Sequence, residues 1–91
     1  GLTVEVLHTP GHTPGGVSLK VGDTLFTGDT LFQGSMGRTD LPGGSYDQLM
    51  DSLRRLAALP GDYKVCPGHD ALSTLETERK SNYYMREALG Q

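Results

Sequence analysis

The chain has 91 residues, of which 35% are hydrophobic and 21% charged, and its formal net charge is −3. A chain of this length suits one domain with a thin margin of stability, because it buries only about 60–65% of its unfolded surface. The sequence contains no basic run and no apolar stretch near the roughly 20 residues of a membrane span, so we expect neither a nucleic-acid nor a membrane partner. The single cysteine, Cys66, excludes an internal disulfide and favours a reducing compartment, so we expect a cytoplasmic protein.

Three segments near the N-terminus have the pattern of β-strands. The first, 2–7, is rich in β-branched residues, and the second, 17–21, alternates apolar and polar positions. A glycine–aspartate pair separates the second from the third, 24–26, which is a strong signal of a hairpin turn. A long polar loop is expected over residues 31–44.

Two helices are predicted, each opened by a capping box. Ser45 begins the first box, and a proline–glycine pair ends that helix. Ser73 begins the second box, and its helix is expected to run to about Leu89 as a polar, weakly amphipathic element on the outside. A short strand, 63–66, is expected between the two helices.

This order of elements predicts an α/β fold in which one mixed or antiparallel sheet carries two helices on one face. The two helices cover only that face, while Val17, Leu19 and Val21 give the sheet an apolar side that needs a second layer. A contiguous apolar face is rarely left in water, so we expect the chain to form a homodimer or to pack against a missing N-terminal half. Residues 1–91 are therefore interpreted as a single half-domain.

Three residues have the chemistry of metal ligands, namely His12, Asp29 and His69. Each follows a predicted strand and has a glycine beside it, so the three loops can meet at one end of the sheet. Imidazole nitrogen and carboxylate oxygen bind Zn²⁺ and similar ions, and a bound ion lowers the pKa of water to about 7. Separations of 17 and 40 residues match no short metal motif, so capping or turn roles for the same residues stay open at this point.

Three motifs resemble metal motifs of the metallo-β-lactamase-fold hydrolases. They are Thr-Pro-Gly-His-Thr-Pro-Gly at 9–15, Phe-Thr-Gly-Asp-Thr-Leu-Phe at 26–32 and Cys-Pro-Gly-His at 66–69. They occur in the family's order, and the runs 37–44 and 73–79 are similar to bacterial glyoxalase II-like members. The chain thus resembles the C-terminal half of such a hydrolase, which is half of an αββα sandwich.

The resemblance implies a binuclear metal-dependent hydrolase. His12 would be a ligand of the first metal, Asp29 a bridging and catalytic ligand, and His69 a ligand of the second metal. Zinc is the implied cofactor, with iron or manganese as alternatives. The implied reaction of the complete protein is hydrolysis of a small-molecule thioester, such as a hydroxyacylglutathione, by metal-bound hydroxide.

The family's His-x-His-x-Asp-His motif is absent from this sequence, which contains only three histidines. Three of the family's seven protein ligands remain, so the isolated chain is expected to be inactive as an enzyme. The alternative is a non-catalytic, self-associating half-domain in which the metal residues are remnants.

Several neighbouring residues have plainer interpretations. His8 is expected to be structural, and Cys66 to be a small buried apolar residue. Asp70 is expected in a turn, with orientation of the preceding histidine as the alternative. Arg38 and Asp40 are expected to form an ion pair that orders their loop, with substrate contact as the alternative.

Overall fold

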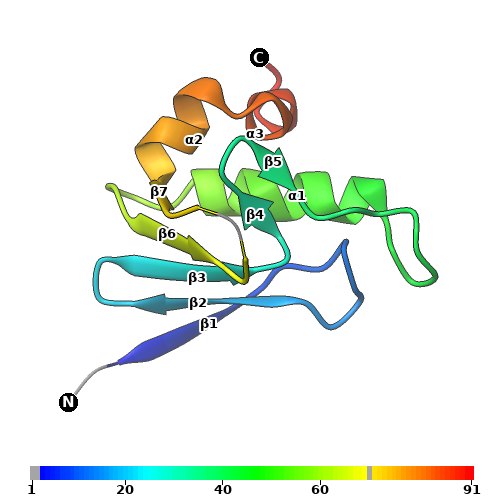
Figure 1. The fold of residues 1–91 in the computed structure, drawn as a ribbon, viewed down its shortest axis with the longest axis horizontal. Helices are drawn as coiled ribbons and strands as arrows, with labels where there is room; N and C mark the ends of the chain where they lie inside the picture. The colour runs from blue at the N-terminus through cyan, green and yellow to red at the C-terminus, as the bar shows by residue number, and fades with distance from the viewer. Residues whose placement is uncertain (1–2, 70) are drawn as a thin grey trace.

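The computed structural model describes residues 3–69 and 71–91, which form one five-stranded sheet, one two-stranded sheet and three helices (Figure 1). The five-stranded sheet contains β1 (Val4–His8), β2 (Val17–Val21), β3 (Thr24–Gly28), β6 (Lys64–Pro67) and β7 (Ser73–Thr74). The two-stranded sheet contains β4 (Leu31–Phe32) and β5 (Ser35–Met36). The helices are α1 (Tyr46–Ala57), α2 (Leu75–Ser81) and α3 (Tyr83–Ala88).

The five-stranded sheet is mixed, as the sequence predicts. Its strand order is β1-β2-β3-β6-β7, and only the β3–β6 pair is parallel. The predicted hairpin joins β2 to β3, with Gly22 at a φ of +59° in the turn. Because parallel strands need a crossover, the chain between β3 and β6 contains the β4–β5 hairpin and α1. As a result β1, β3 and β6 run in one direction, and their C-terminal ends meet at one edge.

The two faces of the sheet differ in burial, and this confirms the prediction of a one-sided sheet. Leu25 and Val65 are fully buried and belong to the core cluster that also contains Leu53 of α1. The opposite face, called here the outer face, exposes apolar residues, and Val6 is 62% exposed. Its other large exposed members are Val4, Val17 and Phe26.

Helix α1 follows the sequence prediction closely. The Ser45 hydroxyl caps its N-terminus by accepting a hydrogen bond from the Gln48 amide at 3.2 Å. Its buried positions recur at helical spacing and face the sheet. They are Leu49, Met50, Ser52, Leu53 and Leu56.

The prediction of one polar helix from Ser73 to about Leu89 is wrong. The segment begins with strand β7 and then forms two helices that break at Asn82, whose ψ is 113°. Thr74, not Ser73, caps α2, because the Ser73 hydroxyl instead donates to the Glu78 carboxylate at 2.5 Å. The segment is also not peripheral, since Met85 of α3 is fully buried in the core.

The expected polar loop over 31–44 is also incorrect in part. Its first six residues form the β4–β5 hairpin, in which Leu31 is fully buried and Phe32 is 7% exposed. Two-residue strands carry too little alternation to give a recognisable pattern. The rest of the loop has no regular strand or helix before α1 begins.

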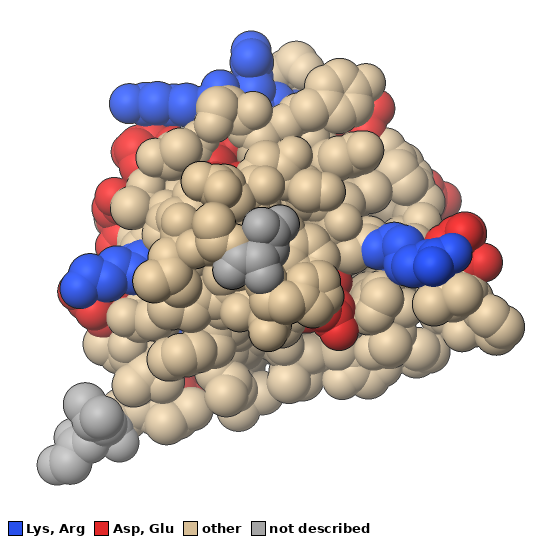
Figure 2. Space-filling model, viewed as in Figure 1, with Lys and Arg blue, Asp and Glu red and all other residues tan. Residues whose placement is uncertain are grey.

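Charged side chains leave no basic surface on the visible face of the molecule. In Figure 2 the lysine and arginine side chains of the described residues lie at separate places near the rim, next to acidic ones. Among the described residues, no helix combines the length and apolar character needed to cross a membrane.

Candidate metal centre

The three predicted ligands come together at the edge where β1, β3 and β6 end. His12 Nε2 lies 3.7 Å from Asp29 Oδ2, and His69 Nε2 lies 3.4 Å from Asp29 Oδ1. The carboxylate therefore presents one oxygen to each imidazole. The side chains of His12, Asp29 and His69 are 23%, 49% and 76% exposed, so an ion from solution can reach them.

These separations suit a divalent ion held between nitrogen and oxygen. Zinc bonds of about 2.0–2.2 Å in a tetrahedral arrangement place two ligand atoms roughly 3.4 Å apart. Both observed separations are close to that value. A pocket of about 170 Å³ lies beside His12 and Asp29. The residues that line it are His12, Thr13, Gly16, Val17, Asp29 and Thr30.

The ligand set is nevertheless incomplete within the part of the chain that the structure describes. Over residues 3–69 and 71–91, no group of three or more His, Cys, Asp or Glu side chains is arranged to hold one ion. The donors instead form two pairs that share Asp29. A catalytic zinc normally has three protein ligands, so each pair supplies only part of what one ion needs.

His12 is oriented by a hydrogen bond to the backbone. Its Nδ1 lies 2.8 Å from the Arg38 carbonyl oxygen. Because a carbonyl can only accept, Nδ1 carries the hydrogen, and Nε2 of the neutral ring is left with a lone pair. That lone pair and the Asp29 carboxylate face each other, which is favourable only with a proton or a cation between them.

A cluster of buried hydroxyls lies beneath the loops of His12 and Asp29. Thr9 Oγ1 is 3.0 Å from Ser18 Oγ and 3.2 Å from Thr30 Oγ1, and all three residues are buried. The cluster ties the end of β1 to β2 and to the residue after Asp29. Because the Ser18 hydroxyl is buried and hydrogen-bonded, Ser18 does not offer an exposed nucleophile.

Two glycines allow the close packing that these loops require. Gly11 has a φ of +137°, and a Cβ there would lie 2.4 Å from Leu49 of α1. Gly37 admits no side chain, since its Cβ would lie 1.9 Å from the Asp29 carbonyl oxygen and 3.2 Å from the His12 Cβ. Gly11 is adjacent to His12 in the sequence, whereas 25 residues separate Gly37 from His12, so the sequence alone indicates the role of Gly11 and not that of Gly37.

The other residues singled out from the sequence have mixed outcomes. His8 Nε2 donates to the Pro14 carbonyl at 3.1 Å, which is the structural role expected of it. Cys66 is half-buried beside Phe26 on the outer face, so the expectation of a buried apolar residue holds only in part. Asp70 lies outside the described residues.

Arg38 and Asp40 form the expected ion pair. Arg38 Nε and Nη2 donate to the two Asp40 oxygens at 2.7 and 2.8 Å. The hydrogen bonds from Arg38 lower the pKa of Asp40 to about 2. Since the Arg38 carbonyl also accepts from His12, this pair orders the segment that orients His12.

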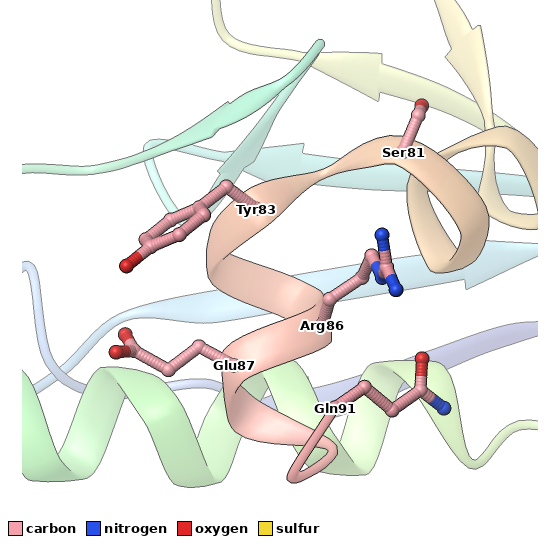
Figure 3. Close-up of a pocket in the computed structure, with 5 residues that line it drawn as sticks. All are labelled: Ser81, Tyr83, Arg86, Glu87 and Gln91. Atoms are coloured by element: carbon pink, nitrogen blue, oxygen red, sulfur yellow. The ribbon is translucent and has the colours of Figure 1, made fainter.

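A separate surface hollow lies along α2 and α3. Its volume is about 420 Å³, and Figure 3 shows its lining at the end of α2, along α3 and at Gln91. The lining residues are Ser81, Tyr83, Arg86, Glu87 and Gln91. Glu87 already accepts a hydrogen bond from the Tyr46 hydroxyl, and no predicted ligand lines this hollow.

Substitution of Gly37 by alanine is expected to disturb the Asp29 turn. The new methyl group would overlap the Asp29 carbonyl, so we expect the free energy of unfolding to fall by about 1–3 kcal/mol. Gly15→Ala is the matched control, because its Cβ would meet nothing within 4 Å, and its effect should stay within about 0.5 kcal/mol. Urea unfolding measures both, and equal effects would contradict the close packing at Gly37.

The Arg38–Asp40 pair predicts a pH dependence at acid pH. The folded pKa of Asp40, about 2, is below the ordinary value of 3.8, so the pair stabilises the loop fully above that ordinary value. This contribution is lost as the pH falls from about 4 to about 2. Carboxyl ¹³C NMR of Arg38→Gln should show the Asp40 midpoint rising toward 3.8. A wild-type midpoint already near 3.8 would show that the ion pair does not persist in solution.

Comparisons with known proteins place the chain in a family. The family model of the metallo-beta-lactamase superfamily matches residues 1–69. The chain is 42% identical over 88 residues to hydroxyacylglutathione hydrolase GloC of Haemophilus influenzae, covering 93% of this chain and 42% of that protein. It is 42% identical over 85 residues to the probable metallo-hydrolase YqgX of Bacillus subtilis, covering 90% and 40%.

Solved structures agree with this assignment. The crystal structure of TTHA1623 in a di-iron-bound form has a TM-score of 0.85 and 46% identity, covering 89% of this chain and 42% of that one. The crystal structure of ETHE1 from Myxococcus xanthus has a TM-score of 0.85 and 42% identity, covering 90% and 39%. The chain therefore spans about two fifths of the length of these relatives. It belongs to the metallo-beta-lactamase superfamily.

Proposed function

We propose that this chain supplies part of the binuclear metal centre of a hydrolase that acts on a thioester such as a hydroxyacylglutathione. The observation that carries the proposal is the placement of the Asp29 carboxylate between the imidazoles of His12 and His69, at 3.7 and 3.4 Å. The similarity to a hydroxyacylglutathione hydrolase supports the substrate class. The similarity to a di-iron-bound protein supports two metal positions.

The residues of this chain would have distinct roles at that centre. Asp29 would bridge, because each of its oxygens faces a different imidazole. His12 would bind through Nε2, since its Nδ1 donates to the Arg38 carbonyl. A divalent ion at this place would polarise a substrate carbonyl and lower the pKa of bound water. Imidazole and carboxylate suit both zinc and iron, so we propose zinc and test iron beside it.

We further propose that a segment outside this chain covers the outer face in a longer protein and provides the remaining ligands. The relatives are more than twice as long as this chain, which leaves ample length for such a segment. The exposed Val4, Val6, Val17 and Phe26 give it an apolar surface to pack on. The isolated chain would bury the same face by pairing with a second copy.

A second function, a self-associating half-domain without catalysis, has one observation in its favour. Over residues 3–69 and 71–91 no three-donor group occurs, so these residues hold no complete metal site among themselves. The two functions share a fold and differ in whether His12, Asp29 and His69 bind metal at all.

Metal binding by the full chain tests the proposed function. We expect zinc and ferrous iron, added separately, to bind weakly to the wild type in a competition titration with a chelating dye. Asp29→Asn should weaken binding more than His12→Gln or His69→Gln, because it removes the group that both donor pairs share. Each substitution should lower the affinity for metal at least about 10-fold, because the loss of a residue that merely hydrogen-bonds to a metal ligand already has an effect of this size.

His8→Gln is the matched control. The contacts with Asp29 come from His12 and His69, whereas the His8 ring donates to the Pro14 carbonyl, so its substitution should leave metal affinity unchanged. Metal affinity that is absent in the wild type, or equally reduced by His8→Gln, would favour the non-catalytic half-domain. In a longer protein that joins this chain to a His-x-His-x-Asp-His segment, we expect thioester hydrolysis that Asp29→Asn abolishes. Hydrolysis that survives Asp29→Asn would refute the catalytic role.

Self-association of the isolated chain is expected to depend on the outer face. Light scattering at micromolar concentration should give a dimer for the wild type and a monomer for Val6→Lys, because a charge would be buried in the interface. Ala58→Lys adds the same charge at an exposed position after α1 and should leave the dimer intact. A wild-type monomer that unfolds cooperatively would overturn the dimer.

A further inference from the structure

We propose that Phe32 is a positioning residue for His69, and that Glu78 and Asn82 hold Phe32 in place. The inference rests on the proposed function, because it concerns how one proposed ligand is oriented. It assigns a role to three residues that the metal centre itself does not use.

The Phe32 ring stacks on the His69 imidazole. The two ring centroids are 4.8 Å apart, and the ring planes differ by 12°. His69 is 76% exposed, so its imidazole has little surrounding protein to fix its rotamer, whereas Phe32 is 7% exposed and is itself fixed. Stacking covers one face of the imidazole and leaves its edge accessible, so Nε2 stays free to face Asp29 Oδ1 at 3.4 Å.

The hairpin that carries Phe32 is held by buried polar groups from α2 and α3. Asn82 Nδ2 donates to the carbonyls of Phe32 and Ser35 at 3.3 and 3.0 Å. The Gly34 amide, in the turn of the hairpin, donates to Glu78 Oε1 at 2.8 Å. Both strands and the turn of the hairpin are therefore bonded to the same two side chains.

The orientation of the Asn82 amide is fixed from its other side. Asn82 Oδ1 accepts from the amides of Tyr84 and Met85 at the start of α3, at 2.9 and 3.1 Å. Because Oδ1 must face these donors, Nδ2 must face the hairpin carbonyls and Glu78. The break between α2 and α3 at Asn82 is what directs this amide toward the hairpin.

The hydrogen bonds of Glu78 and Asn82 fix the position of the β4–β5 hairpin more closely than apolar packing would. Glu78 is 1% exposed and Asn82 is fully buried, and burying such groups costs free energy unless they are bonded. Ser73, Gly34 and Asn82 all donate to the Glu78 carboxylate. Apolar side chains would let a two-residue hairpin slide, whereas hydrogen bonds fix its register and thus the place of the Phe32 ring.

Histidine ring NMR of the metal-free full chain tests the inference. The chain has only three histidines, so His8→Gln and His12→Gln assign the remaining signal to His69. We expect the His69 ring protons of the wild type to be shifted upfield of those of His8 by the Phe32 ring current. Phe32→Leu should remove the shift, and Phe32→Tyr should keep it because the ring is retained.

A second variant tests whether Asn82 holds Phe32 in place. Asn82→Ser keeps a hydroxyl that caps α3 but removes the amide that donates to the hairpin, so the His69 shift should shrink. Titration with zinc should show affinity lowered about 10-fold by Phe32→Leu and restored by Phe32→Tyr. Circular dichroism verifies that each variant is folded.

The outcomes separate this inference from the proposed function. His69 ring protons that resonate with those of His8 in the wild type would overturn the stack, whatever the variants do. Zinc affinity that Phe32→Leu leaves unchanged would overturn the positioning role. A clear upfield shift in a wild type that binds neither zinc nor iron would overturn the proposed function while supporting the contact of Phe32 with His69.

Discussion

The turn from Thr27 to Thr30 is where the loops of the proposed metal centre meet. The Gly68 amide donates to the Gly28 carbonyl at 2.8 Å, and the Gly37 amide donates to the Thr30 carbonyl at 3.2 Å. The Thr30 hydroxyl bonds to Thr9, which leads into the His12 loop. Each loop thus bonds to a residue next to Asp29, either Gly28 or Thr30. These contacts hold the Asp29 carboxylate between two imidazoles, and the closest of them requires glycine at position 37, because a Cβ there would overlap the Asp29 carbonyl oxygen.

Local sequence signals predicted the elements whose stability is also local. The capping box at Ser45 and the hairpin turn at Gly22 depend on neighbours a few residues away, so the sequence alone reveals them. The β4–β5 hairpin and the break at Asn82 depend on each other across about 50 residues, as the bond from Asn82 to Phe32 shows. Neither the hairpin nor the helix break has a sequence pattern of its own, so the sequence predicts a polar loop and one continuous helix instead.

The candidate site shows the same division. Histidine and aspartate beside glycine, each after a strand, made His12, Asp29 and His69 candidates, and the resemblance of their motifs implied that they are ligands. The structure brings all three together. What the sequence did not reveal is how they are held. Gly37, the buried hydroxyl of Thr9 and the ring of Phe32 act through contacts with residues distant in the chain. Their residue types are common in any fold, and only their neighbours give them a role.

The two imidazoles are held by different means, and the difference has a chemical consequence. A hydrogen bond from Nδ1 to the Arg38 carbonyl fixes both the orientation of His12 and the nitrogen that carries its hydrogen. Ring stacking on Phe32 fixes the plane of His69 but does not select its tautomer. The choice of tautomer matters at the ring nitrogen that faces Asp29, because it decides whether that nitrogen has a lone pair or a hydrogen. At His69 the Nε2 edge faces Asp29 Oδ1 at 3.4 Å, a separation that would admit a proton or, in the proposed centre, a metal ion. In the proposed centre, His12 would therefore present Nε2 before any ion arrives, whereas Phe32 would set the ring plane of His69.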